Sequence, residues 1–152
     1  MAISTRGRYG VRALLAIVKA NRPLSTAQIA KLEDISPPYL EQIFNRLKRA
    51  GLVQAKRGAQ GGYTLSKDAA LVSIGDVIAV LDGPVKFSHC HHPDNDEDEC
   101  EKRDYCASRQ FWSDLENSVN TKLYNTTLLD LKNIETGLLA KSKDKSRAAH
   151  IL

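Results

Sequence analysis

The sequence predicts a mainly α-helical protein with a small β-hairpin wing, that is, a winged helix-turn-helix followed by a long dimerisation helix. Three observations predict this fold. Apolar residues of the first half recur at spacings of three and four, as amphipathic helices require. A basic, glycine-rich segment at 56–62 lies between two short β-type segments, directly after a helix–turn–helix pattern. A long amphipathic stretch at 105–124 has little in its neighbouring sequence to cover its apolar side.

Three helices are predicted before the hairpin and one after it. Residues 8–20 form the first, because their apolar residues lie three and four apart. Ser25 or Thr26 caps a short second helix that ends near residue 32. The third helix starts at a proline pair, where a missing N–H costs nothing, and ends at residue 50. Residues 73–81 predict the fourth helix.

The outward side of the third helix carries polar residues that suit base recognition. Gln and Asn pair with adenine edges, Glu accepts from the cytosine amino group, and Lys or Arg hold guanine or phosphate. Polar helix faces are more often merely solvated, so this face decides nothing by itself. Its residues are Pro38, Glu41, Gln42, Asn45, Arg46, Lys48 and Arg49.

The hairpin favours DNA binding over a merely solvated helix face. Its β-type segments at 52–55 and 63–65 enclose glycines that permit a tight turn and close approach to phosphates. In a winged helix the third helix enters the major groove, and the wing lies along the backbone or in the minor groove. A nucleotide-binding phosphate loop is the rival interpretation. It fails because no Gly-Lys-Ser/Thr follows and no helix begins after Gly62.

Composition and charge favour a nucleic-acid partner. Of the 152 residues, 42% are hydrophobic and 26% are charged, and no apolar run approaches the roughly 20 residues of a membrane helix. Residues 1–82 contain 12 Lys and Arg against 6 Asp and Glu, which suggests a polyanionic partner, nucleic acid before membrane. The first residues lack the apolar segment of a secretory signal. We expect a cytoplasmic protein and, without an acid–base pair or a partnered nucleophile, no enzyme.

Three cysteines, Cys90, Cys100 and Cys106, lie in or beside a loop predicted at 84–104. In a cytosolic protein, clustered cysteines favour metal or redox chemistry over a structural disulfide. Widely spaced thiolates in a flexible loop suit an iron–sulfur cluster. Zinc is the rival, although Cys-x2-Cys pairs are lacking. Adjacent histidines would supply its nitrogen ligands: His89, His91 and His92.

The helix predicted at 105–124, about 30 Å long, carries one apolar stripe. A second copy of the chain is the economical partner for it, because operator-binding helix–turn–helix proteins work as two-fold dimers. The alternative is that the stripe packs on its own domain. Residues 1–83 then form the DNA-binding domain, residues 105–132 the dimerisation helix with a short capping helix, and residues 133–152 a flexible tail. The stripe consists of Phe111, Trp112, Leu115, Val119 and Leu123.

Two stretches carry a family resemblance. One is Arg8-Tyr-Gly-Val-Arg-Ala-Leu14, and the other extends from Pro38-Tyr-Leu-Glu-Gln-Ile-Phe-Asn-Arg-Leu47 through Gly51-Leu-Val53 to Arg57-Gly-Ala-Gln-Gly-Gly-Tyr63. Both resemble the IscR-like family of bacterial winged-helix iron–sulfur transcription regulators, over roughly residues 1–132. That family includes the nitric-oxide sensor NsrR, the iron regulator RirA and the cysteine-metabolism regulator CymR, which lacks a cluster.

The resemblance implies a homodimer joined through the long helix and an iron–sulfur cluster that is held by the three cysteines and governs DNA binding. A 2Fe–2S cluster is favoured and 4Fe–4S is possible, with the cluster-assembly machinery as donor. Glu41 and Gln42 would read the groove, and Arg57 of the wing would lie at the DNA. The expected DNA-binding residues are Pro38, Tyr39, Glu41, Gln42, Asn45, Arg46, Lys48, Arg57 and Gly61.

The fourth cluster ligand departs from the family pattern. Members typically have a His three positions after the third cysteine, where this chain has Arg109. The N-terminal Asp of NsrR-type members has no counterpart in Arg8-Tyr9-Gly10, and nine residues rather than five separate the first two cysteines. The candidates for the fourth ligand are, in order, one of His89, His91 and His92, then Glu101 or Asp104, and third an external ligand.

We therefore expect a homodimeric regulator of iron–sulfur cluster biogenesis or iron homeostasis, with operator binding controlled by the cluster. The alternatives are a cluster-free repressor of the same family, serving cysteine metabolism or thiol-redox sensing, and a nitric-oxide sensor.

Overall fold

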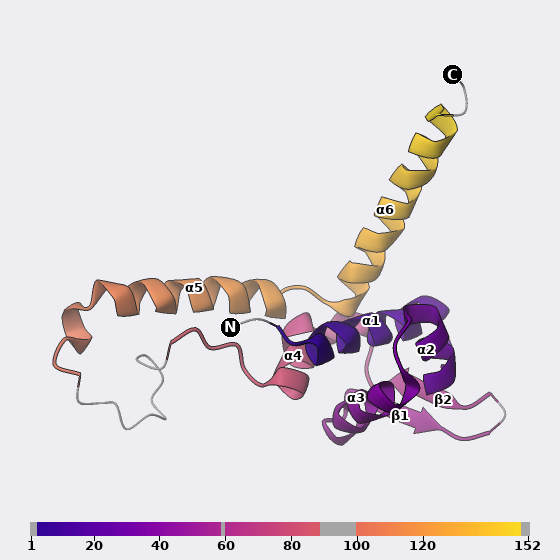
Figure 1. Cartoon of the computed structure of the whole chain (residues 1–152), viewed down its shortest axis with the longest axis horizontal. Coiled ribbons are helices and arrows are strands. Elements are labelled where there is room, and N and C mark those ends of the chain that lie inside the picture. Colours follow the sequence, from indigo (N-terminus) through magenta and orange to yellow (C-terminus); the bar gives the residue numbers. More distant parts are fainter. Residues whose placement is uncertain (1–2, 59, 89–99, 150–152) are drawn as a thin grey trace.

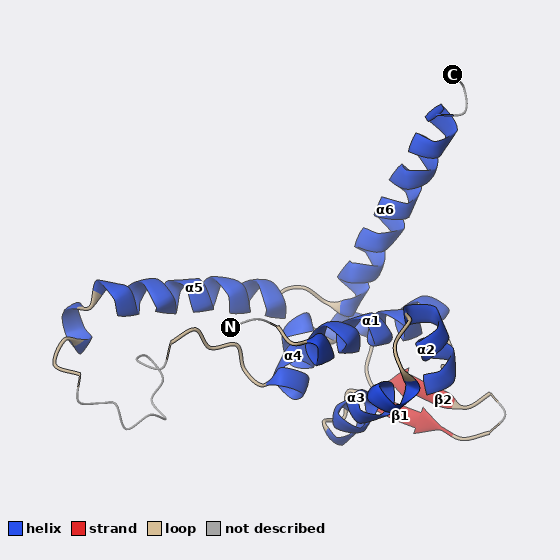
Figure 2. Cartoon of the chain, in the orientation of Figure 1, coloured by secondary structure: helices blue, strands red, loops and turns tan. Residues whose placement is uncertain are grey.

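The computed structural model describes residues 3–58, 60–88 and 100–149, which form helices around one two-stranded hairpin (Figures 1 and 2). The predicted fold class, mainly α with a β-hairpin wing, is confirmed. A winged helix–turn–helix comprises α1 to α4 and the hairpin, and α5 and α6 extend from it in different directions. The elements are α1 (Thr5–Ala20), α2 (Thr26–Glu33), α3 (Pro37–Arg49), β1 (Val53–Lys56), β2 (Gly62–Leu65), η1 (Ala69–Leu71), α4 (Ile74–Asp82), η2 (Arg103–Tyr105), α5 (Ala107–Tyr124) and α6 (Leu128–Ala149).

Serine caps set where the helices begin. Ser25 accepts from the N–H of Gln28, whose side chain accepts from the N–H of Ser25, and Ser73 forms the same reciprocal pair with Asp76. Such capping boxes satisfy two orphan N–H groups at once. Ser4 caps α1, which therefore begins at Thr5, three residues before its predicted start.

The N-terminus of α1 is tied to the end of α4. The Asp82 carboxylate accepts from the backbone N–H of Ser4 at 2.9 Å and from its hydroxyl, and it pairs with Arg6 at 3.4 Å. The two helices touch so closely that a Cβ on Gly7 would lie 2.5 Å from an Asp82 oxygen. The first and last helices of the DNA-binding part are thus held together at one carboxylate.

The core of the winged helix includes a residue from beyond α5. Leu14, Phe44, Leu47 and Val77 are fully buried, and so is Leu128 at the start of α6. Backbone bonds from Ile74 N–H to the Thr126 carbonyl (2.8 Å) and from Leu128 N–H to the Val72 carbonyl (3.0 Å) fix the returning chain. The predicted DNA-binding domain, which ends at residue 83, therefore leaves out Leu128, although Leu128 belongs to its core.

The C-terminal segment differs from its prediction. The sequence predicts a short capping helix before residue 132 and a flexible tail at 133–152, but a single 22-residue helix, α6, occupies 128–149. Leu, Ala and Lys, which are strong helix formers, dominate this sequence, and Gly137 is its weakest position. Thr127 and Asp130 cap the helix reciprocally, and Lys19 of α1 pairs with Glu135 at 3.0 Å.

Candidate nucleic-acid interface and cysteine segment

Helix α3 divides its residues between the core and one open polar face. Leu40, Ile43, Phe44 and Leu47 are buried without measurable exposure. The predicted contact residues on the other side are exposed, namely Pro38, Glu41, Gln42, Asn45, Arg46 and Lys48. Tyr39 is half-buried, with its ring edge-on to Tyr9 at 6.0 Å between centroids. The structure therefore brings the predicted base-reading set onto one accessible helix face.

The wing follows α3 at once and exposes its own cation. β1 and β2 pair antiparallel from Val53–Leu65 to Lys56–Gly62, and Arg57 is exposed at the start of the connecting loop. Gly61 closes the turn by donating to the Gly58 carbonyl at 2.9 Å. A Cβ there would lie 2.5 Å from the Lys56 carbonyl oxygen, so the turn requires glycine at position 61.

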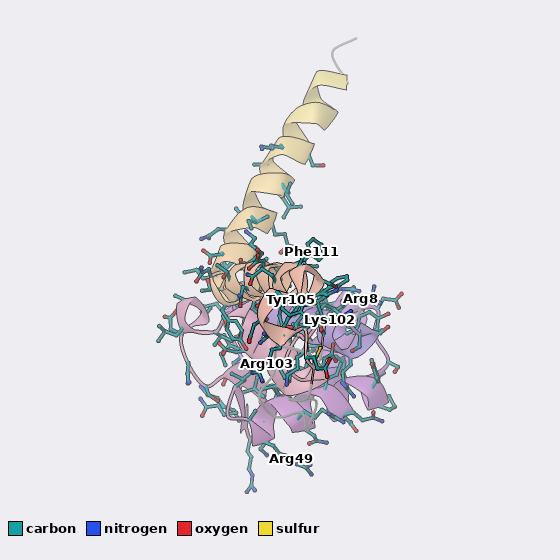
Figure 3. All side chains as sticks on the ribbon, turned by 90° about the vertical axis from the view of Figure 1, so that its left-hand side faces the viewer. Arg8, Arg49, Lys102, Arg103, Tyr105 and Phe111 are labelled. Atoms are coloured by element: carbon teal, nitrogen blue, oxygen red, sulfur yellow. The ribbon has the colours of Figure 1, made fainter. Side chains whose placement is uncertain are left out.

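The charge on this surface is strongly positive. Exposed cations extend from the end of α3 to the wing, and Glu41 is the acidic residue among them. None of these cations has an ion-pair partner within the described ranges. Figure 3 shows Arg49 at the edge of the molecule opposite α6. Unpaired cations beside a hydrogen-bonding helix face are what a phosphate polyanion requires. They are Arg46, Lys48, Arg49, Lys56 and Arg57.

Two of the three cysteines lie within the described residues, both as free thiols. Cys100 is exposed, and Cys106 is half-buried as the N-cap of α5, where its sulfur accepts from the backbone N–H of Arg109 at 3.4 Å. A cavity of about 490 Å³ lies beside Cys106. Cys90 and the histidines His89, His91 and His92 lie outside the described residues.

The described cysteines have the donor chemistry of a thiolate-held cluster. The residue type is suitable, because cysteine thiolates are the usual ligands of iron–sulfur clusters, and the cavity leaves space beside Cys106. Glu101 and Asp104 are exposed in the same segment. Within 3–58, 60–88 and 100–149, however, no three potential metal ligands come together. Arg109, at the position where family members have a histidine ligand, instead donates from its guanidinium to the Arg103 carbonyl at 3.0 Å.

A residue that the sequence analysis missed fastens the start of the cysteine segment. Glu116 of α5 is only 7% exposed and accepts from the backbone N–H of Phe87 at 2.9 Å. Asn120, one turn later, donates to the Val85 carbonyl at 3.5 Å. The sequence contains one signal for this role, because the Glu116 carboxylate interrupts the apolar side of the helix. These side chains attach the chain between α4 and the cysteines to α5.

The apolar stripe of α5 is only partly covered by its own chain. Phe111 and Trp112 are 58% and 38% exposed, with their rings edge-on at 5.0 Å between centroids. Leu115, Val119 and Leu123 are half-buried. The described part of α5 packs mainly on α4, and its first turns extend away from the winged helix (Figure 1). Dimerisation through this stripe stays a prediction.

Residues 3–134 match the Rrf2 family, described as an iron-dependent transcriptional regulator. The chain belongs to the Rrf2 family. It is 37% identical over 135 residues to the HTH-type transcriptional regulator IscR of Yersinia enterocolitica, covering 88% of this chain and 80% of that protein. The IscR of Serratia proteamaculans is 34% identical over 148 residues, with 96% and 88% covered. The IscR-like resemblance is thereby confirmed.

Solved structures of this Rrf2 protein's relatives agree with the fold. CymR, the global cysteine regulator of B. subtilis, superposes with a TM-score of 0.74 at 34% identity, covering 88% of this chain and 98% of that one. T. potens IscR gives 0.70 at 32%, with 89% and 88% covered. The relatives are transcriptional regulators, a non-enzymatic and DNA-binding class. None of the described helices combines the length and apolar character that a bilayer crossing requires.

Proposed function

We propose that this Rrf2 protein is a homodimeric regulator whose operator binding is controlled by an iron–sulfur cluster, and that it governs cluster biogenesis or iron homeostasis. The observation that carries the proposal is the exposed polar face of α3 beside the basic wing. A cytoplasmic location follows from a DNA target. Cys100 and Cys106, just before and at the N-terminus of α5, support control by a cluster. The cluster-assembly machinery would be the donor of that cluster.

At the DNA, α3 enters the major groove and the wing follows the backbone or minor groove. Glu41 accepts from a cytosine amino group and rejects bases that offer only acceptors, while Gln42 and Asn45 pair with adenine. The cations at the end of α3 neutralise phosphates and set the register. Arg57 reaches the adjacent groove from the wing.

The DNA-binding assignment is tested with operator duplexes selected from a random pool by the parent protein. Arg57→Ala should weaken binding by about 1–3 kcal/mol. Glu41→Ala should change the selected sequence, because it removes the base-reading carboxylate. Lys122→Ala, which removes an exposed charge on α5, is the matched control and should bind as the parent does. Parent-like binding by both the Arg57 and Glu41 variants would show that the groove assignment is wrong.

For the cluster, Cys90, Cys100 and Cys106 would supply three thiolates, with 2Fe–2S favoured over 4Fe–4S. When bound, the cluster supplies a group that responds to iron supply and oxidants. The Cys106 sulfur lies at the N-terminus of α5, where it accepts from the backbone N–H of Arg109. The fourth ligand is one of His89, His91 and His92, ahead of Glu101, Asp104 or an external ligand.

The cluster assignment is tested on protein purified without oxygen, by its visible spectrum and by iron and sulfide counts. The expected sample is brown, Cys100→Ala abolishes the colour, and one single His→Ala variant shifts the spectrum or shortens the lifetime in air. An intact cluster in Cys100→Ala would overturn the three-thiolate arrangement. Unchanged spectra in all three His variants would indicate that a carboxylate, and not a histidine, is the fourth cluster ligand.

The chain's own contacts offer a route from the cysteine segment to the DNA-binding face. Glu116 and Asn120 hold residues 85–87 on α5. Asp82, at the other end of this connection, holds the start of α1. Helix α4 packs on α1 and α3 as well as on α5. A change in the cysteine segment therefore acts on elements that directly support α3.

A cluster-free repressor is the second candidate, and the similarity to CymR favours it. In that case the exposed Cys100 thiol would serve thiol-redox sensing or cysteine-linked regulation. A colourless protein that binds its operator and loses binding on mild oxidation would select this candidate. A brown protein whose operator binding responds to nitric oxide would indicate the nitric-oxide sensor.

A further inference from the structure

A second cavity, of about 430 Å³, lies between the hairpin and the helices. Its walls come from the C-terminal end of α1, both strands of the hairpin, the start of η1 and the first turns of α6. These segments are distant in sequence, but α1 packs on both β2 and α6, and α6 packs on η1. Figure 1 shows the base of α6 next to α1.

The rim of this cavity is cationic. Arg22, Lys56, Lys67 and Lys132 all line it, against the single carboxylate of Asp68. The Asp68 carboxylate already accepts from the backbone N–H of Ala70 at 2.8 Å. In the described part of the chain, none of the four cations lies within ion-pair distance of a carboxylate. Four cationic side chains against one carboxylate around a single cavity favour an anionic occupant.

The remaining walls favour an organic anion over a bare inorganic one. Val18, Leu65 and Leu129 provide apolar surface between the charged groups. Thr64 also lines the cavity, and its buried hydroxyl has no hydrogen-bond partner within the described residues. Binding sites for small molecules combine such apolar walls with a few convergent polar groups.

We propose that this cavity binds a small organic anion with two anionic groups, phosphate or carboxylate, on a short carbon frame. The bound anion would bridge Lys132 of α6, Lys56 of β1 and Arg22 after α1, and would hold the hairpin against the helices. Since Lys56 lies at the end of β1 that leads into the wing loop, the ligand would fix the wing's position. Neither of the described cysteines, Cys100 and Cys106, lines this cavity, so we expect this site to act independently of the proposed cluster.

The test uses 3-phosphoglycerate as the probe, because it carries a phosphate and a carboxylate on three carbons. Its binding to the full chain is measured by isothermal titration, and its location by backbone-amide NMR shifts. Shifts should concentrate at Leu65, Lys67, Ala69 and Leu129, and the affinity should fall with added salt. Glycerol, the neutral analogue, should cause no shifts.

A matched pair of α6 variants decides the assignment. Lys132→Glu should weaken 3-phosphoglycerate binding at least tenfold, and Lys132→Met, which keeps the apolar stem, should weaken it severalfold. Lys141→Glu makes the same charge change on the same helix outside the cavity and should leave the affinity within twofold. Circular dichroism confirms that the variants are folded.

Two results would overturn the proposal. One is equal probe affinity in Lys132→Glu and Lys141→Glu, with shifts spread over α3 and Arg57 instead of the cavity. The other is a tenfold loss of operator binding by Lys132→Glu in the absence of any small anion, with no cavity shifts from the probe. The second result would assign the basic rim to the DNA backbone.

Discussion

Phe44 of α3 and Tyr63 of β2 stack with 4.4 Å between ring centroids and 19° between ring planes. Tyr63 also exchanges two backbone hydrogen bonds with Leu24, at 2.8 and 3.2 Å. Helix α3, strand β2 and the segment that leads into α2 therefore meet at one aromatic pair. This pair connects β2 to α3 through the core of the winged helix.

Removing the Tyr63 ring should loosen the wing. Tyr63→Ala should lower the free energy of unfolding by about 2–4 kcal/mol, because it deletes a stacked, half-buried ring. Tyr63→Phe keeps the ring and should cost under about 1 kcal/mol. Urea unfolding measures both, and equal midpoints for the two variants would contradict the role of the stacked pair.

Gly62 should tolerate no side chain. Its φ is +149°, and a Cβ would lie 2.4 Å from the Leu24 carbonyl carbon and oxygen. Gly62→Ala should cost about 3 kcal/mol or more, since backbone strain and a clash with backbone coincide. Gly58, with φ of +112° and open space for 4 Å around the place that a Cβ would take, is the control. Gly58→Ala should show the smaller loss, and the reverse order in thermal unfolding would refute this explanation.

Position 116 should need an acceptor oxygen, which either a carboxylate or an amide can supply. Glu116→Leu leaves the Phe87 N–H without its acceptor and should cost about 1–3 kcal/mol. Glu116→Gln retains an acceptor oxygen and should cost less. Hydrogen exchange at the Phe87 amide is the specific readout, and it should accelerate in the Leu variant only. Equal exchange in both variants would mean that this bond does not hold the segment.

Acid should weaken the cap of α6. The backbone N–H of Thr127, and then its hydroxyl, donate to Asp130 and hold the pKa of that carboxyl below its usual 3.8. The stabilisation is therefore complete above pH 3.8 and is lost as the pH falls through the lower folded-state pKa. Asp130→Asn should remove this part of the acid dependence. An NMR titration should find the pKa of Asp130 below 3.8, and Thr127→Val should raise it part of the way back.

A charge on the α5 stripe should separate the subunits of the proposed dimer. Val119→Glu would place an unpaired carboxylate in an apolar interface, at a cost of several kcal/mol. Asn117→Glu, at an exposed position of the same helix, should leave the oligomeric state unchanged. Sedimentation velocity distinguishes the outcomes, and a parent protein that sediments as a monomer would remove the two-fold arrangement altogether.

The fold was predictable wherever periodicity and caps were local. The stripe of α3, the glycines of the wing and the serine caps all act within a few residues, and those elements lie within three residues of their predicted bounds. The length of α6 was missed because charged residues were interpreted as solvated tail, although they are good helix formers. The roles of Glu116 and Leu128 depend on contacts with residues 29 and 56 positions earlier, and no local pattern records such contacts.

The burial of Leu128 in the winged-helix core has a consequence for synthesis of the protein. Domains tend to fold from the N-terminus as the chain emerges, but this DNA-binding unit lacks a core residue until position 128 has left the ribosome. The cysteines at 90, 100 and 106 are made before that point. A nascent or prematurely terminated chain therefore cannot complete the core of the DNA-binding unit without also carrying all three cysteines.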